Sequence, residues 1–479
     1  MARTTTRTPY RITFAVLAAG AGFFAMLQSL VSPVLSTIQH DLHTSQNTVT
    51  WVLTAYLLSA SVFTPILGRI GDMVGKERMF VVSLVALIAG CLLAVIAPNI
   101  DVLIVARIVQ GVGGAVFPLS FGIIRDEFPA ARSTAAIGAM SALLAAGGGL
   151  GTVLAGPIVG AFGYRGLFWI PMVVLIATAV AAHFLIPESP VRTPGRINWL
   201  ATVLLSGWLV ALMLAVSKAP AWGWTSGKVL GLLLVAVLVL TSWVITETRS
   251  TNPLIDMRVM RLPTVWTTNL VALLFGAGMF AILAFLPQFV QTPTVAGYGF
   301  GASVTEAGLL LVPMLVAMFL TGIVSGRMER ILSGKAQLAA GSAFSVVSCA
   351  LLAVAHDARW QIVVASSVFG IGIGLAYASM TNLIVQNVSA AQTGVAAGMN
   401  ANIRTIGGSI GAAVMSSIVT GHLRPDGLPY ESGFTHGFEM LTVTSLAAVV
   451  AALVVPAVRR ASRTGESGVA PAPLVARHP

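Results

Sequence analysis

Fourteen long apolar runs are the feature of this sequence that most constrains its fold. Each is long enough to cross a bilayer, which takes about 20 residues of helix. They begin near residues 12, 49, 79, 101, 133, 166, 198, 228, 265, 305, 336, 360, 393 and 436. Charged residues make up 9% of the chain, against about a quarter in soluble domains. We therefore expect an all-α polytopic membrane protein.

The basic residues divide unevenly between the two sides of the predicted membrane. If residue 1 is cytoplasmic, 20 of the 27 Lys and Arg lie in cytoplasmic segments, five in outer segments and two, Arg107 and Arg404, within spans. Cytoplasmic loops are enriched in these residues. We therefore expect a multi-pass protein of the cell membrane with both termini in the cytoplasm. The net charge of +11 follows from this bias, and no basic patch indicates nucleic acid.

Repeats and polar stretches divide the chain into four predicted parts. Gly68-Arg69 recurs 258 residues later as Gly326-Arg327, and the glycine-rich run from 147 recurs 260 residues later from 407. Both echoes lie at matching positions of two six-span blocks, as expected of a transporter built from related halves with its substrate site between them. The predicted parts are an N-terminal half (1–190), a linker with two extra spans (191–264), a C-terminal half (265–458) and a disordered tail (459–479).

Two motifs connect this organisation to a known family. Residues 68–78 read GRIGDMVGKER between the second and third spans, and Arg107-Ile-Val-Gln110-Gly111-Val-Gly113 lies in the fourth. These motifs resemble signatures of the major facilitator superfamily of transporters. Residues 37–42, 50–59 and 393–408 also resemble its fourteen-helix drug:proton antiporter branch. The resemblance covers nearly the whole chain and implies the major facilitator fold, with two six-helix halves and two central linker helices.

The resemblance assigns proton coupling and gating to five residues. It ties Arg107 to proton coupling and places Asp72, Lys76 and Asp126 in a charge cluster that latches helix pairs. Gln110 shares a helix face with Arg107 through i, i+3 spacing. Two alternatives remain open at this stage. Arg107 can snorkel to the outer interface, and the cluster can be a solvated charged turn that contributes little.

The fifth span contains a predicted conformational hinge. Small residues allow close helix contact and a proline can kink a helix, which singles out Gly151, Gly156 and Pro157. Exporters of the resembled family carry a glycine- and proline-rich motif in this helix. The match is imperfect because Thr152 follows Gly151, and ordinary small-residue packing is the alternative.

Polar residues at mid-span predict the lining of a substrate cavity. The set is Gln28, Ser32, Asn269, Gln288, Asn382, Asn400 and Arg404. All sixteen acids fall in loops or near helix ends, with Asp101, Glu306 and Glu439 nearest to membrane depth. A cavity for permanent cations would normally hold a buried carboxylate. We therefore expect neutral or weakly charged apolar substrates, and acids in preference to cations.

The function predicted from these features is proton-coupled export of amphipathic, largely apolar compounds by alternating access, as in multidrug or antibiotic efflux. An exporter of lipids or endogenous metabolites is the alternative, and a non-transporting receptor also stays open. A polytopic enzyme is a distant possibility, because the seven histidines are scattered and His40-x-x-His43 with Asp41 is typical of loop polarity. No ATP-binding loop is present. We expect no cofactor or metal, and a monomer whose partners are small substrates, protons and the bilayer.

Overall fold

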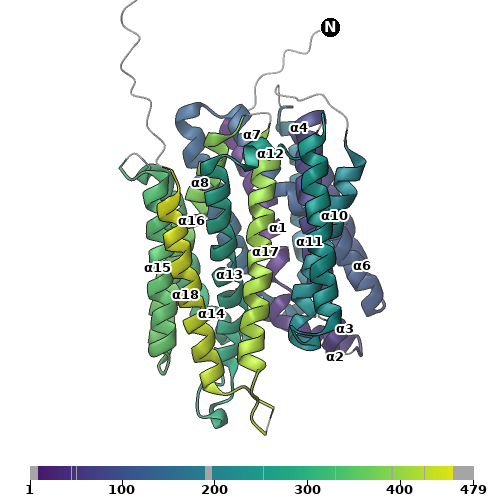
Figure 1. The fold of residues 1–479 in the computed structure, drawn as a ribbon. Helices are drawn as coiled ribbons and strands as arrows, with labels where there is room; N and C mark the ends of the chain where they lie inside the picture. The colour runs from purple at the N-terminus through teal and green to yellow at the C-terminus, as the bar shows by residue number, and fades with distance from the viewer. Residues whose placement is uncertain are drawn as a thin grey trace, which may run out of the picture.

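The computed structural model describes residues 9–44, 46–49, 51–188, 197–251, 253–329, 331–389, 392–425 and 427–456. The predicted tail, 459–479, and residues 191–196 of the predicted linker lie outside these ranges. In the described part, fourteen helical segments are long and apolar enough to cross a membrane. This confirms the expected number of spans and the all-α membrane fold. Figure 1 shows them as one bundle of long helices.

The first half of the bundle contains six spans and a few short helices. Its fourth span is interrupted by a 3₁₀ turn over Val112–Ala115, where three of the four residues have little or no side chain. The elements are α1 (Tyr10–Ser29), η1 (Ser32–Val34), α2 (Leu35–Asp41), α3 (Gln46–Val49), α4 (Trp51–Val74), α5 (Lys76–Val95), α6 (Ile100–Gly111), η2 (Val112–Ala115), α7 (Val116–Glu127), α8 (Ala130–Phe162) and α9 (Gly166–Leu185).

A helical hairpin and a second group of six spans follow. The hairpin is α10 (Trp199–Trp222) and α11 (Gly227–Arg249). The short helix α12 (Met257–Met260) leads to the second half: α13 (Pro263–Gln291), η3 (Thr294–Ala296), α14 (Val304–Met328), α15 (Gly334–Val354), α16 (Arg359–Asn387), α17 (Thr393–Thr420) and α18 (Glu431–Val454). We call the end of the bundle where α1 begins and α18 ends the near face, and the opposite end the far face.

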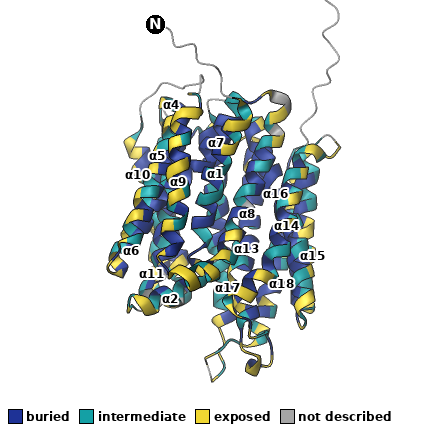
Figure 2. Ribbon diagram, turned by 180° about the vertical axis from the view of Figure 1, so that it is seen from behind, coloured by how far each residue is buried: buried dark blue, intermediate teal, exposed yellow. Residues whose placement is uncertain are grey.

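Each half has its own apolar core. One large cluster of buried residues belongs mainly to α1 and α4–α9, and another mainly to α13–α18. Figure 2 shows buried residues along α7 and many exposed ones along peripheral helices such as α9. The exposed side chains there are apolar, for example Val173 and Phe184, as suits helices that face lipid tails rather than water.

The halves meet along two seams that the internal repeat relates to each other. The fifth span of the first half, α8, packs against the second span of the other half, α14, and conversely α4 packs against α17. Small residues allow the close approach, since a Cβ on Gly149 would lie 1.7 Å from Leu315 Cδ2 and one on Gly322 would lie 2.4 Å from Ala142 Cβ. Helices in lipid associate through such contacts.

The hairpin α10–α11 lies against the α4–α17 seam. Leu205 and Trp208 of α10 share an apolar cluster with Ile66 of α4 and Met399 of α17. Helix α11 packs mainly on α10 and carries a row of exposed apolar residues such as Leu234 and Leu238. The hairpin therefore contacts both halves on one side of the bundle.

Candidate functional site: a cavity between the two halves

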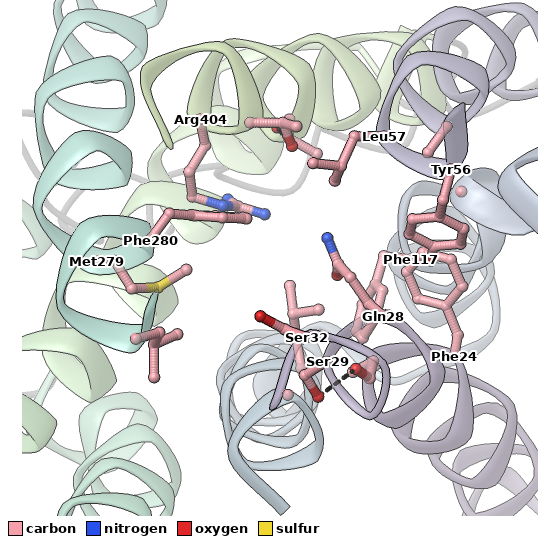
Figure 3. A pocket seen from close by; sticks show the side chains of 18 of the residues that line it. Phe24, Gln28, Ser29, Ser32, Tyr56, Leu57, Phe117, Met279, Phe280 and Arg404 are labelled. Carbon is pink, nitrogen blue, oxygen red and sulfur yellow. Dashed lines mark hydrogen bonds between the residues drawn. The ribbon is translucent and has the colours of Figure 1, made fainter. Parts of the chain in front are cut away.

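A cavity of about 270 Å³ lies between the halves. Its lining comes from α1, α4, α7 and α8 on one side and α13, α14, α16 and α17 on the other, and it is mostly apolar. Of the predicted cavity residues, Gln28, Ser32 and Arg404 line it. Figure 3 shows the Gln28 amide and the Arg404 guanidinium pointing into the same space from opposite halves. Flexible side chains such as Met279 and Phe280 complete this wall, and suit varied apolar ligands.

Arg404 gives the cavity wall a cation. Its guanidinium carbon lies 4.2 Å from the ring centre of Tyr377 on α16, an arrangement in which the ring face stabilises the charge. The backbone makes this placement possible, because a Cβ on Gly276 of α13 would lie 2.2 Å from the Arg404 carbonyl oxygen. An anionic or dipolar group on a ligand would be attracted to this wall.

Arg107 is fully buried beside the cavity. It donates from Nε to the Val52 carbonyl at 3.0 Å and from Nη1 to Gln110 Oε1 at 2.6 Å. Its guanidinium carbon lies 4.2 Å over the ring of Tyr56, and Tyr56 itself lines the cavity. The side chain therefore points into the first half, which is not the geometry of an arginine snorkelling to the interface. Among the described residues, no carboxylate lies within ion-pair distance of it.

The predicted charge cluster is assembled near the near face, between α4, α5 and α7. Lys76 Nζ lies 2.8 Å from Asp126 Oδ2 and 3.6 Å from Asp72 Oδ1. The three side chains are at most 1% exposed, so the cluster is not a solvated turn. The aliphatic stem of Lys76 covers Gly122, where a Cβ would lie 2.6 Å from Lys76 Cδ.

Polar contacts join the halves at this end of the bundle. The backbone N–H of Val395 in the first turn of α17 donates to Asp72 Oδ2 at 3.4 Å. Arg125 donates to Thr393 Oγ1 at 2.6 Å and to the Val388 carbonyl at 2.7 Å. Between them the backbones nearly touch, since a Cβ on Gly68 would lie 3.0 Å from the carbonyl oxygen of Gly394. The near end of the α4–α17 seam is therefore closed.

The remaining predicted cavity residues lie outside the lining of the main cavity. Asn400 Nδ2 donates to Asn269 Oδ1 at 2.9 Å, which pairs α17 with α13 inside the second half. Asn382 is buried on α16, and its Oδ1 has no hydrogen-bond partner among the described residues. Gln288 is exposed near the far end of α13. Asn402, a mid-span amide outside the predicted cavity set, does line the cavity and donates to the Ser61 carbonyl of α4 at 2.6 Å.

The predicted hinge residues lie in a continuous α8. A Cβ on Gly151 would lie 2.2 Å from Ser29 Oγ, so this glycine is at the contact with α1. A Cβ on Gly156 would lie 2.9 Å from Thr305 Oγ1 of α14, at the seam between the halves. Pro157 is inside the helix. The two glycines therefore face different partners of α8, whereas Pro157 is exposed.

Sequence reasoning missed the functional surroundings of these residues. The contact of Arg125 with the other half includes the backbone carbonyl of Val388, which no side-chain pattern reveals. The aromatic residues Tyr56 and Tyr377 carried a signal, because a buried arginine needs a partner and aromatic rings are common ones. The carboxylate of Glu247 was also missed; it is buried and accepts from the N–H groups of Leu254 and Ile255.

One group of residues has the spacing of metal ligands among those described, namely His356, Asp357 and Glu431. It lies at the far end of the second half and shares no lining residue with the cavity. The motif His40-x-x-His43 with Asp41, considered in the sequence analysis, does not form such a group among the described residues. His40 Nδ1 lies 3.8 Å from Asp41 Oδ1, and the His40 side chain is 88% exposed.

In the described part of the chain, fourteen spans form two groups of six and a hairpin, with a central cavity between the groups, an arrangement that suits a membrane transporter. A family model of the Major Facilitator Superfamily matches residues 17–412, and the chain belongs to this family. The crystal structure of the human organic anion transporter MFSD10 is similar in fold, with a TM-score of 0.66 and 12% sequence identity over 93% of this chain and 100% of that one.

Similar curated proteins are bacterial proteins named for resistance, export or multidrug transport. The tetracenomycin C resistance and export protein of Streptomyces glaucescens is 28% identical over 86% of this chain and 77% of its own length. The multidrug transporter protein MdtP of Bacillus subtilis is 27% identical over 86% and 76%. The methylenomycin A resistance protein of Streptomyces coelicolor is 28% identical over 86% of both chains. The chain is thus a multi-pass membrane protein of the Major Facilitator Superfamily, and it is similar to proteins named for resistance and export.

Proposed function

We propose that this protein exports amphipathic, largely apolar organic compounds across the cell membrane in exchange for protons. The observation that supports this most is the cavity between the halves, which combines an apolar lining with Gln28, Ser32 and Arg404. Such a lining binds hydrophobic molecules loosely and gives a few polar groups for orientation. The similarity to proteins named for resistance and export favours outward transport.

The contacts at the near face support alternating access. The excess of basic residues favours placing this face in the cytoplasm, with both termini. The conformation with Arg125 and Asp72 bound to the second half then has its cytoplasmic side closed. Release of these contacts, with bending of α8 near Gly151, Gly156 and Pro157, would open the cavity to the cytoplasm for loading.

Proton coupling is proposed to involve Arg107 and Gln110. A fixed cation next to the cavity, with hydrogen bonds to backbone carbonyls rather than to an acid, raises the cost of another positive charge nearby. Entry of a proton and binding of a substrate without positive charge would therefore be favoured at different stages of the transport cycle. The charge cluster of Asp72, Lys76 and Asp126 is proposed to stabilise the conformation closed at the near face.

The test of this function is transport into inside-out vesicles from cells that lack their own pumps. An imposed proton gradient, acidic inside, should drive accumulation of a neutral or acidic hydrophobic antibiotic, and an uncoupler should abolish it. ATP alone should have no effect in vesicles without a proton pump. Accumulation that is insensitive to the uncoupler would exclude proton coupling, and absence of accumulation for every hydrophobic compound would exclude efflux of this class.

The substrate preference has its own comparison. Arg404→Gln removes the cation from the wall and keeps a polar side chain, so transport of an acidic compound should fall several-fold more than transport of a neutral one. Strong protection of cells against a quaternary ammonium dye alone would contradict the preference, because it would require an acid such as Glu306 or Asp101 to reach the cavity.

A natural metabolite is the second candidate substrate class. One relative, 28% identical over 87% of this chain, is named a probable actinorhodin transporter of Streptomyces coelicolor. Export of an endogenous lipid or metabolite would use the same cavity and the same cycle. We propose that the protein acts as a monomer, since each chain contains both halves and the whole cavity lining.

A further inference from the structure

A second hollow, of about 280 Å³, lies at the far face of the second half. It is bounded by the turn after α13, the loop between α15 and α16, and the start of α18. The turn is shaped by Gly297 and Gly299, whose positive φ angles of 84° and 73° favour glycine. The side chains of His356, Asp357 and Glu431 form one side of this hollow, and the transport cycle proposed above does not use them.

His356 is held rigidly with one ring nitrogen directed at a carboxylate. Its residue is 9% exposed, and its ring packs edge-on against Phe289, with centroids 5.2 Å apart and an interplanar angle of 86°. Its Nδ1 lies 2.7 Å from the carbonyl oxygen of Leu352 in the last turn of α15. A carbonyl oxygen can only accept, so Nδ1 carries the proton. This is the arrangement that orients histidine ligands in metal sites.

The other nitrogen then faces a second acceptor. His356 Nε2 lies 3.1 Å from Glu431 Oε1. With the proton on Nδ1, this nitrogen presents a lone pair to a carboxylate oxygen, and the two lone pairs repel unless a positive centre lies between them. A second proton or a metal ion can supply it. The neighbouring carboxylate of Asp357 favours the metal ion, because a proton shared by His356 and Glu431 would need no third group.

The spacing of the three side chains suits a metal ion. Their ligand atoms all lie within 4.8 Å of one another. Two ligands of a tetrahedral Zn²⁺ with bonds of about 2.0 Å are about 3.3 Å apart, close to the 3.1 Å between His356 and Glu431. Three protein ligands leave a fourth position for water. One imidazole among the ligands favours zinc over magnesium or calcium, which prefer oxygen alone.

We propose that His356, Asp357 and Glu431 bind a divalent transition-metal ion, with Zn²⁺ as the best fit. The ion would tie the loop between α15 and α16 to the first residue of α18, on a platform formed by Phe289 of α13. All these elements belong to the second half. Metal binding would therefore stabilise that half against unfolding and would leave the movement of the halves free.

The test measures zinc binding by the purified full-length protein in lipid nanodiscs after treatment with a chelator. Competition with a chromophoric chelator should give one Zn²⁺ per chain at this site, and zinc should raise the melting temperature, because a ligand that binds only the folded state stabilises it. His356→Asn, Asp357→Asn and Glu431→Gln should each weaken zinc binding by about tenfold or more. His356→Asn retains an N–H donor for the Leu352 carbonyl.

His422→Asn is the matched control, because His422 is an exposed histidine in the loop before α18. Its zinc affinity and zinc-induced stabilisation should equal those of the wild type. Failure of the wild type to bind zinc would overturn the proposal. Equal binding by the three ligand variants, or equally tight binding of magnesium, would also overturn it. Neither readout depends on transport.

Discussion

At the scale of single residues, the two arginines at membrane depth occupy different environments. Arg107 donates to the backbone carbonyls of Val52 and Leu27 and to Gln110 inside the first half, whereas Arg404 faces the cavity above Tyr377. Both have an aromatic face as a partner, which offsets part of the cost of burying a cation. The structure thus places one of these cations at the cavity wall and encloses the other among its hydrogen-bond partners.

Arg107→Ala should abolish transport against a substrate gradient and leave part of the downhill exchange, because the cavity lining stays while the fixed cation is lost. Arg107→Lys should recover only a part, since lysine lacks the planar five-donor group that reaches Val52 and Gln110 together. Transport by purified protein in proteoliposomes with a set proton gradient measures both. Wild-type uphill transport by the alanine variant would remove Arg107 from the coupling mechanism.

Asp72→Asn keeps the shape of the side chain and removes its charge. The Val395 N–H then donates to a neutral acceptor, and the charge-assisted part of this hydrogen bond, about 1 kcal/mol or more, is lost. A loss of about 1 kcal/mol corresponds to about a fivefold change in the population of the conformation closed at the near face. We expect normal expression with a several-fold slower turnover. Asp101→Asn, an exposed acid at the far end of α6, is the control. Equal turnover in the two variants would limit the cluster to a structural role.

Prediction from the sequence succeeded where the residues of a contact belong to a recognisable motif. Lys76 and Asp126 are 50 residues apart, yet the family motif placed both at the cytoplasmic end of the first half. It failed where the partner is a backbone group or a distant residue. Glu247 bonds to two N–H groups, and His356 meets Glu431 across 75 residues. Neither partner leaves a periodic pattern in the sequence.

At the scale of helices, the closed near face depends on close contact between α4 and α17. Gly68 of α4 lies against the backbone of Gly394 at the first turn of α17, so the contact has no room for a side chain.

Fourteen spans were predictable because bilayer thickness sets the length of an apolar run. The seams between spans were not, since small residues are common in every membrane helix.

Gly68→Val should hold the near face apart, because backbone atoms at Gly394 cannot move aside as a flexible side chain can. We expect the conformation open at the near face to gain population and transport to fall strongly. The measurement is labelling of Ala397→Cys, a buried position of α17, from the near side in a background without Cys91 and Cys349. Gly231→Val, on α11 where a Cβ meets nothing within 4 Å, should leave labelling low. High labelling of Ala397→Cys before the Gly68 change would contradict a closed near face.

At the scale of the whole molecule, the even number of spans places the start of α1 and the end of α18 at the same face, the near face. The charge distribution predicts that this face is cytoplasmic. Ser226, at the start of α11, and Ser333, at the start of α15, then lie on opposite sides of the membrane. Both are N-cap residues whose hydroxyl oxygens accept from helix N–H groups.

Ser226→Cys should react with an impermeant thiol reagent added to intact cells, and Ser333→Cys should react only after the cells are opened. The buried native cysteines should give little background. Replacing an N-cap serine costs about 1 kcal/mol, which a fourteen-span bundle tolerates. A reversed labelling pattern would invert the membrane orientation and, with it, the direction of transport proposed here.

The hairpin α10–α11 makes the two seams of the bundle unequal. It covers the α4–α17 seam, and its Trp224 Nε1 donates to Ser417 Oγ of α17 at 2.8 Å. Along the other seam, Leu150 and Leu154 of α8 and Leu309 and Val316 of α14 are exposed. A hydrophobic compound dissolved in either leaflet therefore meets the hairpin at the α4–α17 seam, but meets the helices of the two halves directly at the α8–α14 seam. Any sideways passage between lipid and cavity would be one-sided, despite the twofold repeat.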